Sequence, residues 1–262
     1  MNTEKVISYI TNWLLDYAKK ANVKGFVIGI SGGIDSAVTS TLAAKTGLKV
    51  ICLELPIFQD IKQVNRAKNH IHFLKTNFTN VSSIQVDLTP TFKTFVESVN
   101  SNQKDELDKL ALANTRSRLR MLTLYYYAQI NHCLVVGTGN KIEDFGIGFF
   151  TKYGDGGVDL SPIADLTKSE VYQIGKYLNI IEAILNAPPT DGLFGDERTD
   201  QDQIGASYPE LEWAMSFLEN KTIKKNLTQR ETEVLSIFSK LNQTNQHKIN
   251  PIPVCLIPSE FK

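Results

Sequence analysis

Cysteine is scarce in this sequence, and the cysteines that it has lie far apart. Cys52, Cys133 and Cys255 show no close spacing, whereas disulfide-stabilised scaffolds and structural zinc sites need several cysteines at short intervals. Cys52 and Cys133 lie inside apolar, strand-like runs, which predicts that both are ordinary core residues. This scarcity excludes a disulfide framework and a zinc site built from cysteines.

An excess of charge of one sign is also lacking. The chain has 28 lysines and arginines against 28 aspartates and glutamates. Proteins that bind nucleic acid or an anionic membrane surface through a general electrostatic field have a clear positive excess, so neither nucleic acid nor a membrane is an expected partner. Any positive charge that meets a nucleotide must therefore be local.

Long hydrophobic runs are missing as well. No apolar stretch approaches the roughly 20 residues that a membrane-spanning helix needs. The N-terminal segment Met1–Lys20 has apolar residues at helical spacing with lysines between them, which predicts an amphipathic helix and not a signal peptide. We therefore expect a soluble, cytoplasmic protein.

Short apolar runs alternate with helix-like stretches through the first half of the chain. Runs that are short and nearly all apolar are typical of strands covered on both faces, and their alternation with helices indicates a doubly wound, mostly parallel α/β sheet with helices on both faces. The length of 262 residues favours a single domain over residues 1–262. Strands are predicted at Gly25–Ile30, Lys49–Leu55, Ser83–Val86 and Cys133–Gly137. Further helices are predicted at Asp105–Gln129, Lys168–Leu178, Tyr208–Glu219 and Thr228–Leu241.

A Gly-rich turn follows the first predicted strand and opens a helix. Its sequence is Ser31-Gly32-Gly33-Ile34-Asp35-Ser36. Adjacent glycines let the backbone approach an anion closely, and the free N–H groups at a helix start point toward it. A carboxylate such as Asp35 among phosphates would repel them unless a cation lies between, so the turn predicts Mg²⁺ bound to a polyphosphate. A Gly turn before an ordinary helix is the alternative.

This turn lacks both the G-x-G-x-x-G pattern of dinucleotide-binding folds and the Gly-Lys-Ser/Thr ending of the Walker loop. It resembles the S-G-G-x-D-S loop of the ATP pyrophosphatase superfamily, which has a Rossmann-like fold of the adenine nucleotide alpha-hydrolase type. The resemblance implies that ATP is split between its α and β phosphates, which transfers AMP to an acceptor and releases pyrophosphate. The ATP-binding residues implied in the loop are Gly29, Ile30, Ser31, Gly32, Gly33, Ile34, Asp35 and Ser36.

Three polar segments further along the chain closely resemble ammonia-dependent NAD synthetase. They are 137–143 (GTGNKIE), 150–159 (FTKYGDGGVD) and 162–168 (PIADLTK). The resemblance extends upstream to Asn114–Met121, and downstream to Pro188–Gly192 and His247-Lys248. It implies that the carboxylate of deamido-NAD attacks the α-phosphorus of ATP, and that ammonia then displaces AMP from the adenylate to give NAD.

The same resemblance implies a role for individual residues. Two Mg²⁺ ions on Asp35 and Glu143 would screen the triphosphate. Arginine and lysine would meet phosphates of the acceptor, and Asp159 would accept a hydrogen bond from it. The further ATP contacts are Thr138, Lys168 and Thr190, the contacts to deamido-NAD are Arg118, Lys152, Asp159, His247 and Lys248, and the catalytic residues are Asp35, Lys152 and Lys168.

The sequence departs from the family pattern at three places. One extra residue stands between Glu143 and Lys152, which makes Asp144 a rival metal ligand, although the distance of Glu143 from Thr138 favours Glu143. Glu54 ends the second strand where relatives have a basic ATP contact. The candidates to replace that contact are Gln59, Gln63 and Arg66, and the differing segment Phe194–Gln203 is a hypothetical lid over ATP, within 192–206.

The nitrogen donor and the oligomeric state follow from the same resemblance. The synthetase pattern begins near the first residue, and no cysteine has an amidase setting. We therefore expect ammonia as the direct donor, with a separate glutaminase as an open alternative. The family is typically a homodimer with the dinucleotide near the subunit interface, and the long helix predicted over Asp105–Gln129 suits such a contact.

Three rival functions remain in view. A tRNA-thiolation enzyme fits poorly with the balanced charge and the absence of a Cys-x-x-Cys pair. A GMP-synthetase-like enzyme fits poorly with the segment 150–159. A non-catalytic nucleotide-binding protein would keep the Gly-rich turn and lose turnover, which the joint presence of Asp35, Glu143, Lys152 and Lys168 disfavours.

Overall fold

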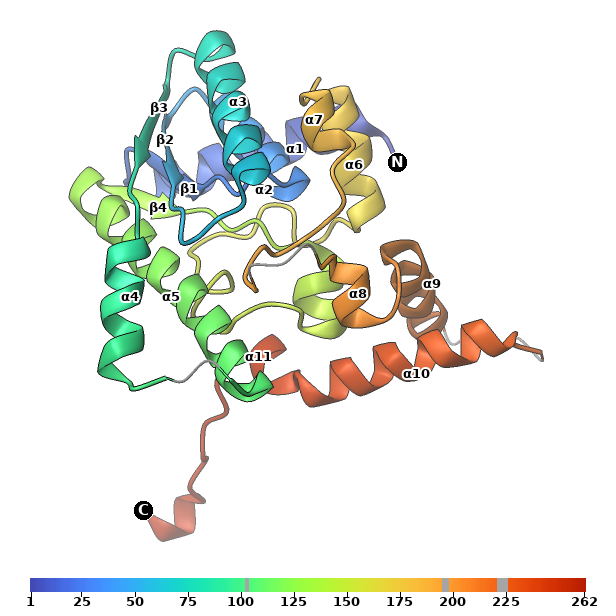
Figure 1. Cartoon of the computed structure of the whole chain (residues 1–262). Helices are drawn as coiled ribbons and strands as arrows, with labels where there is room; N and C mark the ends of the chain where they lie inside the picture. The colour runs from blue at the N-terminus through green and yellow to red at the C-terminus, as the bar shows by residue number, and fades with distance from the viewer. Residues whose placement is uncertain (102–103, 195–197, 221–225) are drawn as a thin grey trace.

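The chain forms a parallel four-stranded sheet, which lies in the upper part of the molecule in Figure 1. The computed structural model describes residues 1–101, 104–194, 198–220 and 226–262. The strand order is β3-β2-β1-β4, and β1 pairs in parallel with both β2 and β4. The strands are β1 (Gly25–Gly29), β2 (Lys49–Glu54), β3 (Val81–Gln85) and β4 (Cys133–Val135).

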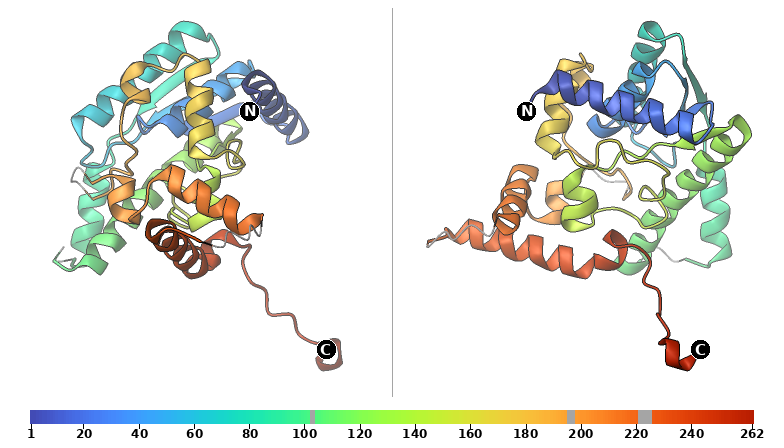
Figure 2. Two further views of the ribbon diagram at one scale, coloured as in Figure 1. Left: turned by 90° about the vertical axis from the view of Figure 1, so that its right-hand side faces the viewer. Right: turned by 180° about the vertical axis from the view of Figure 1, so that it is seen from behind.

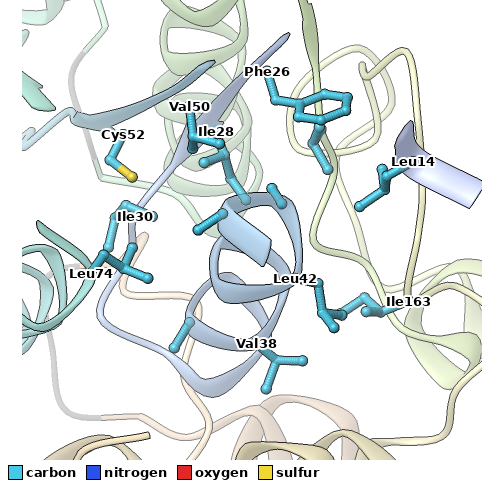
Figure 3. Packing of buried hydrophobic residues seen from close by; sticks show 14 of the residues in the cluster. Leu14, Phe26, Ile28, Ile30, Val38, Leu42, Val50, Cys52, Leu74 and Ile163 are labelled. Atoms are coloured by element: carbon cyan, nitrogen blue, oxygen red, sulfur yellow. The ribbon is translucent and has the colours of Figure 1, made fainter. Parts of the chain in front are cut away.

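One face of the sheet packs against a layer of helices. The apolar residues of α1 face this layer at i, i+3 and i+4 intervals, because that spacing places them on one side of a helix. Phe26, Ile28 and Leu42 are fully buried here (Figure 3). The helices on this face are α1 (Thr3–Lys20), α2 (Ile34–Lys45), α3 (Ile61–Asn77), α6 (Lys168–Tyr177) and α7 (Glu182–Leu185).

The other face of the sheet is covered by α4 (Thr89–Ser98) and α5 (Glu106–Asn131). Val27 and Leu53 point to this side and share a buried apolar cluster with Leu112 of α5. The strands are therefore apolar on both faces, which explains their continuous apolar runs. The predicted parallel α/β sheet with helices on both faces is confirmed.

A third group of elements lies beyond the carboxyl ends of the strands. The helices α9 and α10 lie together below the sheet in Figure 1, and they share a separate apolar cluster with η1 that includes Ile142, Leu211 and Phe238. The C-terminal segment extends away from the rest of the chain in both views of Figure 2. The elements here are the π-helix η1 (Ile142–Ile147), the α-helices α8 (Asp200–Ile204), α9 (Tyr208–Glu219), α10 (Gln229–Thr244) and α11 (Gln246–Ile249), and the terminal 3-10 turn η2 (Ser259–Phe261).

The predicted helices and strands are all present with shifted boundaries, whereas the π-helix η1 and the short helix α8 were not predicted. The strand predicted to reach Gly137 ends at Val135 because the chain turns there, and Gly137 N donates to Leu160 O at 2.7 Å. The third strand begins at Val81 and not at Ser83. Helix α5 ends at His132, which has a left-handed backbone with φ 58°. None of the helices described is long and apolar enough to cross a membrane.

Candidate active site

The predicted Gly-rich turn forms a cradle at the start of α2. Gly32 has φ +82°, and a Cβ there would lie 2.5 Å from the carbonyl oxygen of Gln63, so only glycine fits. The Ser31 hydroxyl accepts from Gly33 N at 3.2 Å and lies 3.1 Å from the Ser36 hydroxyl. The N-cap position of α2 has no side-chain cap, which leaves N–H groups of the first turn for an anion.

The cradle lies where the sheet topology reverses. The chain leaves β1 toward β2, while β4 lies on the opposite side of β1, so the loops after β1 and β4 diverge. Open α/β sheets bind ligands in the crevice at such a point. A cavity of about 300 Å³ opens there. It is lined by every residue predicted to bind ATP or metal, namely Gly29, Ile30, Ser31, Gly32, Gly33, Ile34, Asp35, Ser36, Thr138, Glu143, Lys168 and Thr190.

A buried ion cluster joins three elements inside this cavity. The ammonium of Lys168 lies 2.5 Å from Asp35 Oδ2 and 2.9 Å from Glu143 Oε1. Lys168 is the first residue of α6, which a capping box between Thr167 and Glu170 fixes in place. Asn140 Nδ2 lies 3.4 Å from Asp35 Oδ1. Two carboxylates thus surround one ammonium, and the cluster has an excess negative charge.

The charges of this cluster control its protonation. Burial lowers the pKa of Lys168, but the adjacent charges of Asp35 and Glu143 and its hydrogen bonds to both outweigh burial, so the pKa is raised overall. Burial is the largest effect on Asp35 and raises the pKa of its carboxyl, while the Lys168 ammonium opposes it. Lys168 therefore stays charged and serves as the cation between the two carboxylates.

Two residues that the sequence analysis missed complete the cluster. The Tyr208 hydroxyl lies 2.5 Å from Glu143 Oε1 and 2.8 Å from Asp200 Oδ2. The Lys168 ammonium lies over the Tyr208 ring, 4.5 Å from its centroid. Burial raises the pKa of Asp200 to about 6. The helix beginning at Tyr208 was predicted, but no local signal shows that the start of α9 meets Glu143, which is 65 positions away.

Glu143 and Asp144 both lie in the π-helix η1. A π-helical turn holds one residue more than an α-helical turn, and such bulges frequently occur at functional sites. Glu143 joins Lys168 and Tyr208, whereas the carboxylate of Asp144 lies beside Gly139 at the cavity wall. Burial raises the pKa of Asp144 to about 7. The geometry thus favours Glu143 over Asp144 as the partner of Asp35.

Positive charge also reaches the cavity near the end of β2. The three replacements considered for the basic contact near Glu54, namely Gln59, Gln63 and Arg66, all line the cavity. Arg66 Nε donates to Gly32 O at 3.1 Å and so braces the cradle. Arg120 of α5, which the sequence analysis did not single out, lines the cavity too and donates to Leu55 O and to Gln59 Oε1. Burial lowers the pKa of Arg120 to about 10, and its guanidinium stays charged.

Four of the five residues predicted to bind deamido-NAD form a second group, which we call the acceptor cluster: Arg118, Lys152, His247 and Lys248. Arg118 Nε donates to Lys152 O at 3.3 Å, and Lys152 Nζ donates to the carbonyl oxygen of His247. Lys248 Nζ donates to Phe150 O at 2.8 Å. These four are outside the lining of the ATP cavity. Helix α5, the loop after η1 and helix α11 each contribute to the cluster.

The fifth predicted residue, Asp159, lies apart from the acceptor cluster. Its carboxylate accepts from Val135 N at 2.8 Å and from the Tyr125 hydroxyl at 3.1 Å. Burial is the largest of the effects that raise the pKa of Tyr125 to about 12, followed by the charge of Asp159. Asp159 thus closes the end of β4, and the structure places it with neither the ion cluster nor the other four residues.

The segment proposed as a lid, Phe194–Gln203 within 192–206, includes residues 195–197, which lie outside the described residues. Its described ends are tied together. Asp200 N donates to Pro189 O at 3.0 Å, and the Thr190 hydroxyl donates to Arg198 O at 3.0 Å. Thr190 therefore reaches the cavity from the base of this segment.

Comparison with known proteins identifies the family. The family model described as NAD synthase matches residues 6–252. The chain belongs to the NAD synthase family. A relative from Carboxydothermus hydrogenoformans named NH(3)-dependent NAD(+) synthetase is 35% identical over 254 residues, which are 95% of this chain and 96% of that protein.

Two solved structures extend the similarity of this NAD synthase family member to the whole fold. The structure of NMN synthetase from Francisella tularensis superposes with a TM-score of 0.84 at 33% identity and covers 99% of both chains. An NH3-dependent NAD synthetase from Campylobacter jejuni, solved with a nitrate ion, superposes with a TM-score of 0.78 at 25% identity. That match covers 98% of this chain and 100% of the other.

Proposed function

We propose that this chain catalyses the last step of NAD synthesis, the ATP-dependent amidation of deamido-NAD with ammonia to give NAD, AMP and pyrophosphate. The observation that carries the assignment is the buried cluster of Asp35, Lys168 and Glu143 beside the glycine cradle. It combines a phosphate-binding turn with a lysine and two carboxylates at the switch point of the sheet. The relatives named NH(3)-dependent NAD(+) synthetase support the choice of substrates.

In the first step, a carboxylate oxygen of the acceptor forms a bond to the α-phosphorus of ATP, and the bond from that phosphorus to the bridging oxygen breaks. The electron pair leaves with pyrophosphate. The cradle at 29–36 holds the leaving phosphates through backbone N–H groups. Lys168 and Thr190 add donors, and Arg120 supplies positive charge from the β2 side. Positioning and electrostatic stabilisation do most of the catalytic work.

Asp35 and Glu143 fit a role in holding Mg²⁺. Their oxygen atoms are the ligand type that Mg²⁺ prefers, and nucleotide sites often supply only one or two carboxylates because phosphate oxygens complete the coordination. Among the residues described, no group of three or more His, Cys, Asp or Glu side chains forms a ready metal site, consistent with a site completed by ATP. When bound, Mg²⁺ would stabilise the charge that develops on pyrophosphate.

In the second step, ammonia attacks the acyl carbon of the adenylate. A carbon–nitrogen bond forms, the carbon–oxygen bond to AMP breaks, and the nitrogen loses a proton. We propose free ammonia as the direct donor, as in the names of the curated relatives. A separate glutaminase that supplies this ammonia is a further hypothesis. We also propose a cytoplasmic location for the protein.

The acceptor cluster is the proposed binding site for the anionic part of deamido-NAD. Arg118, Lys152 and Lys248 present cationic groups around one loop, and charge-assisted hydrogen bonds to phosphate are stronger than their present bonds to carbonyls. Asp159 would accept a hydrogen bond from the ligand at the end of β4. We propose that both parts of the site belong to one domain over residues 1–262.

A second candidate substrate is the mononucleotide acid, nicotinate mononucleotide. The observation in its favour is the similarity to the Francisella tularensis NMN synthetase, whose product by name is a mononucleotide. The chemistry at the α-phosphorus and the acyl carbon would be identical, and only the acceptor would lack its adenylate half. Assays with each acid at equal concentration separate the two, because kcat/KM ranks them directly.

We further propose a homodimer formed along α5. Leu122, Tyr126 and Ile130 are exposed and follow each other at four-residue intervals, so they share one face of the helix. Arg118 continues the same face, which would place the acceptor cluster beside the interface. Light scattering at micromolar concentration is expected to give twice the chain mass, and Tyr126→Glu is expected to reduce it. A monomeric mass for the unaltered protein would contradict the proposal.

The experiment that tests the function supplies ATP, Mg²⁺, ammonium and deamido-NAD to the purified protein and follows NAD, AMP and pyrophosphate together. Equimolar formation of all three, dependent on ammonium, is the expected result. Formation of AMP and pyrophosphate without NAD would indicate a different acceptor. An absence of ATP cleavage would favour a non-catalytic nucleotide-binding protein.

A further inference from the structure

The hydroxyl of Tyr208 connects two carboxyl groups that lie far apart in the sequence. It is 2.5 Å from Glu143 Oε1 and 2.8 Å from Asp200 Oδ2. Tyr208 is 8% exposed and Asp200 is 5% exposed. The proposed reaction uses neither residue, although Asp200 lines the same cavity as Asp35 and Glu143.

This polar pair is unfavourable as a purely structural feature. Tyr208 packs into an apolar cluster with Leu211 and Ala214, where a phenylalanine would keep the packing. Asp200 Oδ1 is buried without a hydrogen-bond partner in the described structure, and an unpaired buried polar atom is costly. The contact of Tyr208 with Glu143 therefore explains why this polar pair is buried here.

Fixed helix starts set the position of both residues. Tyr208 opens α9 behind the capping box of Ser207 and Glu210, and Asp200 opens α8 behind the capping box formed with Thr199. The backbone N–H of Asp200 also donates to Pro189 O at 3.0 Å. Because the capped helix fixes Tyr208, its hydroxyl approaches Glu143 from one direction only. This hydrogen bond limits the rotation of the Glu143 carboxylate.

The present hydrogen bonds of Glu143 show why this matters. Tyr208 and Lys168 both donate to the same atom, Glu143 Oε1. Lys168 also pairs with Asp35, so its ammonium must leave these carboxylates before it can turn to a phosphate of ATP. Tyr208 is then the remaining side-chain donor, among those described, that holds Glu143 in place.

We propose that Tyr208 and Asp200 are positioning residues for Glu143: the Tyr208 hydroxyl orients the Glu143 carboxylate in the cavity, and Asp200 orients that hydroxyl. The inference rests on the proposed role of Glu143 in metal binding. Outer partners of metal-binding carboxylates commonly affect metal affinity by about 10- to 100-fold. Neither Tyr208 nor Asp200 touches the reacting atoms in this assignment.

Direct binding of Mn²⁺ tests this without relying on turnover. Mn²⁺ is titrated by electron paramagnetic resonance into the full-length protein saturated with α,β-methylene-ATP, which is not cleaved. Tyr208→Phe is expected to weaken Mn²⁺ binding by about 10-fold or more, at the lower end of the range for such partners. Tyr177→Phe is the matched control, because Tyr177 is an exposed tyrosine on α6, and it should bind Mn²⁺ like the unaltered protein.

Two changes at Asp200 separate positioning from packing. The single hydrogen of the Tyr208 hydroxyl goes to Glu143, so residue 200 orients this hydroxyl by donating to its oxygen. Asp200→Asn keeps such a donor in its amide N–H, so it should bind Mn²⁺ more tightly than Asp200→Ala. Mn²⁺ binding to a folded Tyr208→Phe variant at the unaltered affinity would overturn the inference. If that variant does not fold, equal affinities of Asp200→Ala and the unaltered protein would overturn it instead.

The same titration distinguishes failure of the inference from failure of the proposed function. Glu143→Gln should lose Mn²⁺ binding if Glu143 is a metal ligand. If the unaltered protein binds Mn²⁺ and Glu143→Gln does not, the metal role stands, and only the Tyr208 and Asp200 variants decide the inference. If Glu143→Gln binds Mn²⁺ normally, the metal role of Glu143 fails, and the inference fails with it.

Discussion

Lys168 in the ATP cavity and the three cations of the acceptor cluster are held in opposite ways. Lys168 is 4% exposed and lies between two carboxylates. Arg118, Lys152 and Lys248 donate instead to the carbonyl oxygens of Lys152, His247 and Phe150. Over the ranges that the structure covers, none of these three forms an ion pair with a carboxylate.

This difference indicates how each region meets its ligand. A carboxylate neutralises a cation, whereas a neutral carbonyl leaves its charge available to an incoming anion. The acceptor cluster can therefore attract an anionic substrate without breaking an ion pair. Lys168 is instead already paired with two carboxylates, and removal of one member of a buried ion pair leaves an uncompensated charge, which is strongly unfavourable. Substitutions in the cluster of Asp35, Lys168 and Glu143 should thus affect the rate of ATP cleavage, and substitutions in the acceptor cluster should affect the affinity for deamido-NAD.

The largest expected effect comes from Asp35→Asn. The change removes a charge from the buried cluster and from the proposed metal site, so ATP cleavage should fall by about 10²- to 10³-fold, as for loss of other electrostatic stabilisers of a transition state. Pyrophosphate release measures the loss, and calorimetry with deamido-NAD should show nearly unchanged acceptor binding. Equal ATP turnover in the variant would remove Asp35 from the metal site.

Lys152→Met should raise the KM for deamido-NAD by about 10-fold or more, because one charge-assisted hydrogen bond is lost, worth roughly 1.5–3 kcal/mol. The KM for ATP should stay unchanged. Initial rates over both substrate concentrations provide the measurement. Lys176→Met removes an exposed lysine of α6 and serves as the control. An equal rise in both KM values would erase the distinction between the two regions.

Arg120→Met tests binding of the other substrate, ATP. Arg120 lines the ATP cavity and braces Leu55 and Gln59, so its loss should raise the KM for ATP by roughly 10-fold, comparable to loss of one hydrogen bond to a charged group. The KM for deamido-NAD should change little. Lys152→Met and Arg120→Met should thus each raise the KM of a different substrate. A larger effect on deamido-NAD than on ATP would show that Arg120 belongs to the acceptor site.

A smaller effect, on stability only, is expected at His70 behind the cradle. Its ring is fully buried and lies 2.9 Å from the Ser40 hydroxyl, and burial lowers its pKa to about 4 from the ordinary 6.5. The unfolded chain therefore binds a proton more readily than the folded chain. Stability from this group is complete above pH 6.5 and is lost as the pH falls toward 4, by up to about 3 kcal/mol.

Thermal melts between pH 7.5 and pH 5 check this pH dependence. The unaltered protein should lose several degrees of Tm over that range, since about 1 kcal/mol corresponds to roughly 2–4 °C for a chain of this size. His70→Asn should show a shallower decrease. His72→Asn is the control, because His72 is exposed on the same helix. A decrease of the same size in the His70 variant would contradict the assignment to His70.

Much of the ATP site was predictable because it is local. The turn at 31–36 lies between a strand and a helix that are adjacent in the chain, so its residues form the cradle through short-range geometry alone. The family resemblance added Thr138, Glu143, Lys168 and Thr190, and the structure brings all four to the same cavity. The orientation of Glu143 and Asp144 depended on η1, because apolar periodicity does not reveal a π-helical turn.

The residues that were missed depend on contacts between distant segments. Arg120 reaches the cavity because α5 crosses the sheet beside the end of β2. Tyr208 meets Glu143 and Asp200 only because α9 packs against η1 and α8 joins the same apolar cluster. In sequence, each of them resembles an ordinary residue of a helix, and no spacing rule marks it.

The sequence by itself determined the alternation of strands and helices, the phosphate-binding turn and the family, because these depend on short-range patterns of apolar residues, glycines and motifs. Only the tertiary structure decided which carboxylates share Lys168, whether Glu143 or Asp144 joins that cluster, and which cations remain without a carboxylate partner in the described chain. Those properties depend on distances between groups and on burial, and packing sets both.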